Sequence, residues 1–90
     1  MKIEIYINWD EQEILRPQDY QERKKTLIKE YTDDLYKETL EEVLDDFSPK
    51  DIFYFDDEDR AEVYQIVSDR IKARVNEDME EDYEKITLEI

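Results

Sequence analysis

Residues 2–9 read Lys2-Ile3-Glu4-Ile5-Tyr6-Ile7-Asn8-Trp9, and apolar and polar side chains alternate along this stretch. A period of two residues is typical of a β-strand with one buried face. One face of this strand would present Ile3, Ile5, Ile7 and Trp9, and the other Lys2, Glu4, Tyr6 and Asn8. Residues 86–90 alternate in the same way, so we expect a C-terminal strand that pairs with the first.

The residues after the first strand indicate a hairpin and then a helix. Asp10, Glu11 and Gln12 interrupt the apolar pattern before residues 13–15, which favours a tight turn into a short second strand, although the preferred Gly or Asn-Gly is missing. Pro17 lacks an N–H, which costs nothing in the first turn of a helix. A helix is therefore expected to begin there.

Apolar residues then recur at spacings of three, four and seven from Tyr20 to Phe47, which predicts an amphipathic helical segment. Within it, Thr32-Asp33-Asp34 either caps a new helix or lies within one long kinked helix, because Thr and Asp side chains compete for backbone hydrogen bonds. Of these alternatives we favour two helices.

Two further helix starts follow. Ser48 before Pro49, with Asp51 three residues after the serine, is typical of an N-cap and predicts a short helical turn that includes Ile52, Phe53 and Phe55. The acidic run Asp56–Asp59 suits the positive end of a helix. It leads into apolar residues at helical spacing, namely Val63, Ile66, Val67, Ile71 and Val75.

The pattern as a whole predicts one acidic α+β domain over residues 1–90. Its small antiparallel sheet would consist of an N-terminal strand or hairpin plus the C-terminal strand, packed against three to four helices. Among the tyrosines, Tyr20, Tyr31 and Tyr64 are expected at the rim of the core, and Tyr6, Tyr36 and Tyr54 are candidates for exposed contact residues.

The composition excludes several kinds of chemistry. The chain has no His, Cys or Gly, so Ser-His or Cys-His nucleophiles, thiolate or imidazole metal sites and glycine-rich phosphate loops are absent. We expect no catalytic residues, no cofactor and no metal site. An oxygen-liganded calcium site at Asp56–Asp59 is the open alternative, but the run lacks the Gly and Glu of an EF-hand loop, which favours a charged N-cap.

The ends of the chain and its hydropathy bear on its location. The N-terminus is too short and too charged for a signal peptide, and no apolar run approaches the roughly 20 residues of a membrane span. We therefore expect a cytoplasmic protein.

The most informative feature is the charge. Asp and Glu number 28 against 13 Lys and Arg, for a formal net charge of −15. Such a field repels nucleic acid and anionic membranes and attracts basic protein surfaces. Asp34, Glu38, Glu41, Glu42 and Asp45 fall along one helix face, with about 6 Å per four-residue step, comparable to the phosphate spacing along a nucleic acid strand. The predicted partner-binding residues are these five together with Asp46, Asp56, Asp57, Glu58 and Asp59.

The alternative interpretation of the acidic residues is a solvated surface without a partner, as for most charge runs. The basic clusters Arg23-Lys24-Lys25 with Lys29, and Arg70, Lys72 and Arg74, are expected to form intramolecular ion pairs rather than a nucleic-acid site, because the surrounding field repels phosphates.

The opening residues 2–9, the Tyr- and Glu-rich helices and the size of the chain resemble the small acidic inhibitors of bacteriophages and mobile elements, the DNA-mimic anti-restriction and anti-CRISPR proteins. This resemblance implies a non-enzymatic inhibitor whose carboxylates occupy the basic nucleic-acid groove of a host nuclease, a Cas9-type effector or a restriction enzyme. A small interaction or regulatory module, such as an antitoxin-like partner or accessory subunit that uses an apolar patch, is the alternative. The sequence leaves the oligomeric state open.

Overall fold

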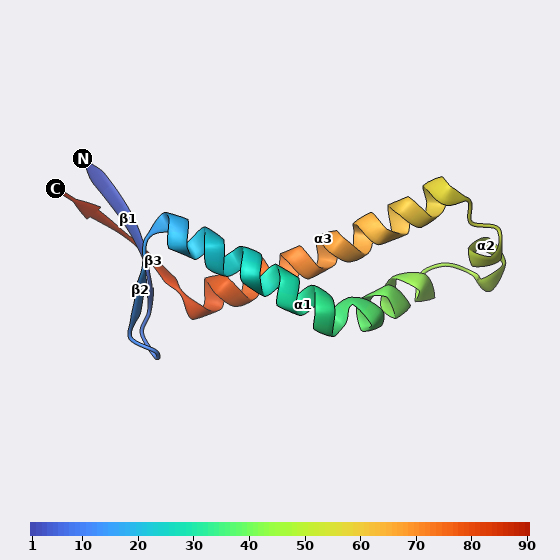
Figure 1. The fold of residues 1–90 in the computed structure, drawn as a ribbon, viewed down its shortest axis with the longest axis horizontal. Coiled ribbons are helices and arrows are strands. Elements are labelled where there is room, and N and C mark those ends of the chain that lie inside the picture. Colours follow the sequence, from blue (N-terminus) through green and yellow to red (C-terminus); the bar gives the residue numbers. More distant parts are fainter.

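The computed structural model describes all residues, 1–90, and places a small sheet at one end of a long helical hairpin (Figure 1). The order of elements is β1 (Lys2–Asn8), β2 (Glu13–Leu15), α1 (Pro17–Asp45), α2 (Pro49–Phe53), α3 (Asp57–Asp82) and β3 (Glu84–Glu89). The molecule measures 60 × 26 × 17 Å, and α2 lies at the end of the hairpin farthest from the sheet (Figure 1).

The sheet has the strand order β2-β1-β3, and both pairings are antiparallel. Ile7 lies opposite Ile14, and Ile5 opposite Ile86. The turn between β1 and β2 has no glycine, and Gln12 takes the left-handed conformation there with φ 54°. The predicted hairpin and the pairing of the two ends of the chain are therefore confirmed.

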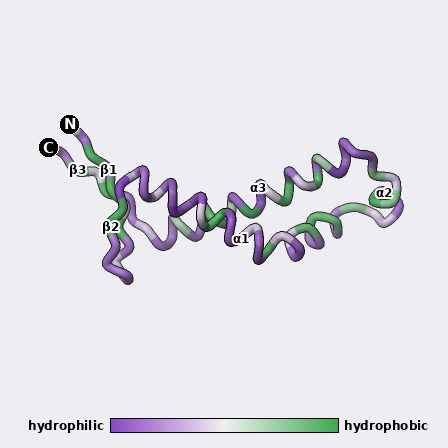
Figure 2. Tube along the Cα trace, viewed as in Figure 1, coloured by the Kyte–Doolittle hydropathy of each residue, from purple (hydrophilic) through white to green (hydrophobic).

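The helices cover the face of the sheet opposite to the one that the apolar alternation favours. Tyr6 stacks on Tyr20 of α1 with ring centroids 3.8 Å apart, and Asn8 is buried on the same side of β1. The other side, which we call the isoleucine face, has no helix over it (Figure 2). By strand register it comprises Ile3, Ile5, Ile7 and Trp9, Ile14 of β2, and Ile86 and Leu88 of β3, with Met1 and Ile90 beyond the strand ends.

The expectation of two helices between residues 17 and 47 is wrong, because α1 is continuous from Pro17 to Asp45. The hydroxyl of Thr32 donates to the carbonyl of Ile28, one turn earlier. Its hydrogen bond is therefore made within the helix, while Asp33 and Asp34 point to solvent. No side chain at residues 32–34 therefore takes the backbone hydrogen bonds of α1, and the helix continues.

The predicted starts of α2 and α3 are confirmed. The Ser48 hydroxyl accepts a hydrogen bond from the backbone N–H of Asp51. Asp56 and Asp59 form a reciprocal capping box at the start of α3. The helical turn is shorter than expected, because α2 ends at Phe53, and Phe55 lies beyond it with its ring edge-on to Phe47.

The core is a thin seam between α1 and α3, in two clusters. Tyr20, Val75, Met79 and Tyr83 form the cluster next to the sheet, and Val43, Val63, Val67 and Ile71 form the other. Only nine residues are buried. Tyr20 and Tyr31 contact the first cluster as predicted, whereas the predictions for Tyr6 and Tyr36 were wrong, since both pack partly buried against the core.

The α+β fold with a hairpin-plus-C-terminal-strand sheet is confirmed, with three helices because α1 is unbroken. None of the helices combines the length and the apolar character needed to cross a bilayer.

Candidate acidic binding surface

Five of the exposed carboxylates in the second half of α1 are the ones predicted to face a partner. By the 3.6-residue period four of them lie on the side of α1 opposite the buried Val43, which contacts α3 residues of the core, and Glu42 lies at the edge of that side. No basic side chain pairs with any of them, because the six ion pairs of the structure involve other acids. We call this set the carboxylate face: Asp34, Glu38, Glu41, Glu42 and Asp45.

The carboxylate face is unfavourable for the helix that presents it. Like charges three or four residues apart each destabilise a helix by about 0.2 to 0.5 kcal/mol. The last turn of α1 contains no basic residue, so the partial negative charge of the helix C-terminus is also uncompensated. Folding alone therefore gives no reason for this arrangement.

Asp46, predicted with the same set, lies just beyond α1 and forms an ion pair. Its carboxylate accepts a hydrogen bond from the guanidinium of Arg70, at 3.2 Å, and so links the end of α1 to the middle of α3. An exposed ion pair of this kind contributes little to stability. It does lower the charge that Asp46 offers to a partner.

The Asp56–Asp59 run has mainly a structural role. Asp56 accepts from the backbone N–H of Asp59 at 2.8 Å, and this hydrogen bond lowers the pKa of the Asp56 carboxyl from its ordinary value. The Asp59 carboxylate accepts from the backbone of Asp56, and Asp57 pairs with Arg60 at 3.2 Å. Glu58 alone has no partner. No three acidic side chains of the chain are arranged to hold a metal ion.

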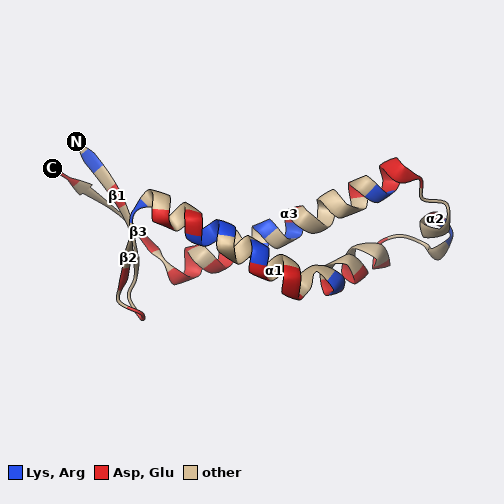
Figure 3. Ribbon diagram, viewed as in Figure 1, with Lys and Arg blue, Asp and Glu red and all other residues tan.

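The negative charge is concentrated at one end of the molecule. Residues 30–62, which we call the acidic end, contain fourteen acids and three bases, so they account for eleven of the fifteen net negative charges. They comprise the second half of α1, α2 and the first turns of α3, the part of the hairpin remote from the sheet (Figure 3).

Two exposed aromatic rings lie within the acidic end. Phe53 and Tyr54 are 81% and 71% exposed, and their rings meet edge to face with centroids 5.2 Å apart. The prediction for Tyr54 is confirmed, whereas Tyr64, expected at the core rim, is 51% exposed. Phe53 was missed as an exposed residue, because a five-residue helix packs only one side against its neighbours, and in α2 the partly buried residue is Ile52.

The basic residues lie mostly along the middle of the hairpin and the first half of α1 (Figure 3). Arg23 pairs with Glu13, Lys25 with Glu22, and Arg70 with Asp46, as the prediction of intramolecular pairing requires. Lys24 instead lies over the ring of Tyr20, and no ion pair forms at Lys29, Lys72 or Arg74.

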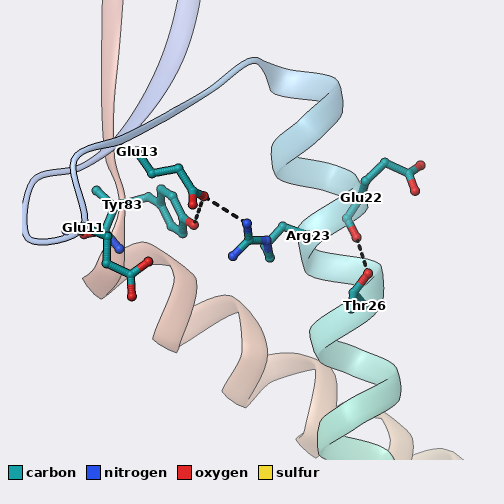
Figure 4. Close-up of polar contacts among 7 residues, drawn as sticks. Glu11, Glu13, Glu22, Arg23, Thr26 and Tyr83 are labelled. Atoms are coloured by element: carbon teal, nitrogen blue, oxygen red, sulfur yellow. Dashed lines mark hydrogen bonds and ion pairs between the residues drawn. The ribbon is translucent and has the colours of Figure 1, made fainter.

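A polar joint holds the sheet against the hairpin (Figure 4). The Glu13 carboxylate accepts from the Tyr83 hydroxyl at 2.7 Å and from the Arg23 guanidinium at 3.1 Å, which connects β2, α1 and the end of α3. Burial, and then the hydrogen bond to Glu13, raise the pKa of Tyr83 to about 12. Sequence patterns did not indicate this joint, because its three residues are far apart in the chain.

Comparison with family models, with curated proteins and with solved structures found no match. The function is therefore argued from the geometry and charge of the chain itself.

Proposed function

We propose that this protein is a non-enzymatic inhibitor that acts in the cytoplasm of a bacterial host. It binds the basic nucleic-acid groove of a host defence nuclease, a Cas9-type effector or a restriction enzyme, by mimicking the charge of DNA. In this proposal it does not bind nucleic acid directly and needs no cofactor.

The observation that supports the proposal most strongly is the carboxylate face. It presents five exposed acids without a cationic partner, at a cost to the helix. A groove lined with Arg and Lys would supply the missing countercharges, because such grooves bind phosphates mainly by charge.

The spacing of the carboxylate face suits that role. From Asp34 to Asp45 the helix rises about 16 Å. Five carboxylates over this length are about 4 Å apart on average along the axis, close to the rise of about 3.4 Å between phosphates along one DNA strand. Phe53 and Tyr54, exposed within the acidic end, add aromatic side chains of the kind that often anchor a protein interface.

Cleavage assays with two matched variants test the proposal. The face variant replaces Glu38, Glu41 and Glu42 with Gln and Asp45 with Asn. The control variant neutralises the same number of acids elsewhere, at exposed positions without ion pairs: Asp10→Asn, Glu11→Gln, Glu77→Gln and Glu89→Gln.

The wild-type protein and the control variant should inhibit DNA cleavage by a guide-loaded Cas9-type effector or by a restriction enzyme. The face variant should be at least about 30-fold weaker, about 2 kcal/mol for lost charge-assisted contacts. Normal cleavage by both enzymes in excess wild-type protein would reject these targets, and equal inhibition by the two variants would reject the role of the carboxylate face.

A second candidate function is a small acidic interaction or regulatory module, antitoxin-like or an accessory subunit, that contacts its partner through an apolar surface. The uncovered isoleucine face favours it. The salt dependence of partner binding distinguishes the two, because raising the ionic strength weakens a charge-based complex and leaves an apolar one largely unchanged.

A further inference from the structure

The isoleucine face is the largest apolar surface that the fold leaves uncovered. Trp9 is 64% exposed, Ile14 65% and Leu88 47%, although all three lie beside other apolar side chains of the same face. Ile7, Trp9 and Ile14, with Gln12, line a shallow hollow of about 330 Å³ on it. Both core clusters lie on the helix side of the sheet, so no element of this chain covers the face.

The face is almost free of charge. Register places the charged residues of β1 and β3 on the opposite side of the sheet: Lys2, Glu4, Lys85 and Glu89. Glu84 is the one acid on the isoleucine face, and its carboxylate accepts a hydrogen bond from the indole N–H of Trp9. In a chain of which 46% is charged, the near absence of charged residues from this face is typical of the core of a protein interface, from which water is excluded.

The area is sufficient for a dimer. A large apolar side chain has roughly 100 to 200 Å² of surface when fully exposed. Multiplied by the exposed fractions, these areas give the isoleucine face an exposed apolar surface on the order of 600 Å². That value is at the upper limit for the largest patch of an ordinary monomer. Two such faces in contact bury about 1,200 Å², which reaches the range of stable interfaces.

We propose that the isoleucine face is the interface of a homodimer, in which two sheets pack face to face across a two-fold axis. The composition favours a second copy, because homodimer interfaces are more apolar than interfaces with foreign partners, which keep more polar residues. Packing of two twisted sheets at about 30° lets rows of isoleucine interdigitate.

This arrangement also limits the repulsion between two chains of charge −15, because eleven of those net charges lie in the acidic end. The hairpin lies on the far side of the sheet and extends away from it (Figure 1). The two acidic ends therefore lie at opposite ends of the dimer, separated by many times the Debye length of about 8 Å at physiological salt. A dimer would present two acidic ends, one to each of two partner molecules.

Sedimentation equilibrium of the purified chain tests the dimer, because it reports mass independently of the elongated shape. The wild type should have twice the 11.2 kDa of one chain at about 50 µM and should dissociate on dilution. Trp9, the single tryptophan, lies in the interface, so its fluorescence should shift to longer wavelength over the same dilution.

Two neighbouring substitutions in β3 locate the interface. Leu88→Lys places a charge on the isoleucine face and should weaken dimerisation about 100-fold or more. Thr87→Lys places the same charge on the opposite side of the strand, facing Glu4, and should leave the dimer unchanged. Both side chains are exposed in the single chain, so far-UV circular dichroism should show the same helix content in each variant.

A single-chain mass at about 100 µM would overturn the proposal and leave the face to a foreign partner. A dimer that tolerates Leu88→Lys as well as it tolerates Thr87→Lys would overturn it too, because the contact would then lie elsewhere. Neither result bears on the inhibition assays with the face variant, so the two proposals fail separately.

Discussion

Neutralising the carboxylate face should stabilise the fold even though it should weaken inhibition about 30-fold or more. The face variant removes four charges from the exposed side of α1 and keeps the shape of each side chain. Gln and Glu have similar helix propensities, as do Asn and Asp, so the change in stability reports charge almost alone.

The expected gain in the free energy of unfolding follows from the spacing of the acids along α1. The carboxylate face contains five like-charge pairs three or four residues apart: 34/38, 38/41, 38/42, 41/45 and 42/45. The face variant removes all five, for about 1 to 2.5 kcal/mol at 0.2 to 0.5 kcal/mol each, less about 0.2 to 0.5 kcal/mol for the attraction between Lys37 and Glu41 that it also removes. Loss of the charge of Asp45 beside the helix C-terminus adds about 0.3 to 1 kcal/mol. For a domain of this size each kcal/mol raises the melting temperature by about 4 to 8 °C.

Urea unfolding followed by circular dichroism, at about 20 mM and 500 mM NaCl, measures the effect. The free energy of unfolding of the face variant should exceed that of the wild type at low salt, and the difference should shrink at high salt. The control variant should change by a few tenths of a kcal/mol, because its four acids form few helical like-charge pairs. A face variant no more stable than the wild type at low salt, or a gain that salt does not reduce, would refute the assignment of an electrostatic cost.

Three further substitutions test the fold. Tyr83→Phe should lose about 1 to 1.5 kcal/mol at pH 7. This is the contribution expected of a hydrogen bond to a partly exposed charged group, because burial, the larger cause of the raised pKa, penalises only the ionised phenolate and adds nothing at pH 7. Because its pKa is raised, Tyr83 stays protonated in the folded state at a pH at which the unfolded chain releases this proton. The stabilisation by Tyr83 is therefore complete below about pH 10 and is lost as pH rises through 12. The free energies of unfolding of the two proteins, measured in urea, should converge over that range, and a constant difference would contradict this role of Tyr83. Gln12→Gly should gain about 0.5 to 1 kcal/mol by relieving a left-handed backbone, a gain that the urea midpoint would show, whereas a loss would mean that the turn is not strained. Ile71→Ala should cost about 2 to 5 kcal/mol, since Ile71 is 2% exposed between α1 and α3, and a melting temperature close to that of the wild type would show that the seam is not packed as described.

Local signals of the sequence predicted the elements well. Alternation predicted β1 and β3, Pro17 marked the start of α1, and Ser48 and Asp56 capped α2 and α3. Each of these signals acts within a few residues, so it does not depend on tertiary packing. The error at Thr32 has the same local scale, because its hydroxyl could either accept from a backbone N–H as an N-cap or donate to a carbonyl within the helix, and it donates to Ile28.

Which face of the sheet the helices cover could not be predicted. Alternation assigns residues to two faces but does not say which one the rest of the chain packs against. The more apolar side of β1 was the natural choice for a monomer. The stacking of Tyr6 on Tyr20 and the joint around Glu13 hold the hairpin on the other side, and both depend on residues far apart in the chain.

The exposed residues of the candidate site were predictable in part. The helical period correctly placed the carboxylate face on the outside of α1. It did not show that Asp46 reaches Arg70, nor that three of the four acids in Asp56–Asp59 pair within their own helix turn. Such pairings depend on side-chain geometry that spacing alone does not determine.

Competition for one binding site is the most direct measurement of the central claim. Labelled duplex DNA bound to a guide-loaded Cas9-type effector, or to a restriction enzyme, is titrated with this protein while fluorescence anisotropy is recorded. The account predicts full displacement by the wild type, weaker displacement as salt rises, and the need for about 30-fold more of the face variant to displace the same amount of DNA. A ternary complex in which the protein and the DNA are bound together, or equal displacement by the face variant, would contradict it.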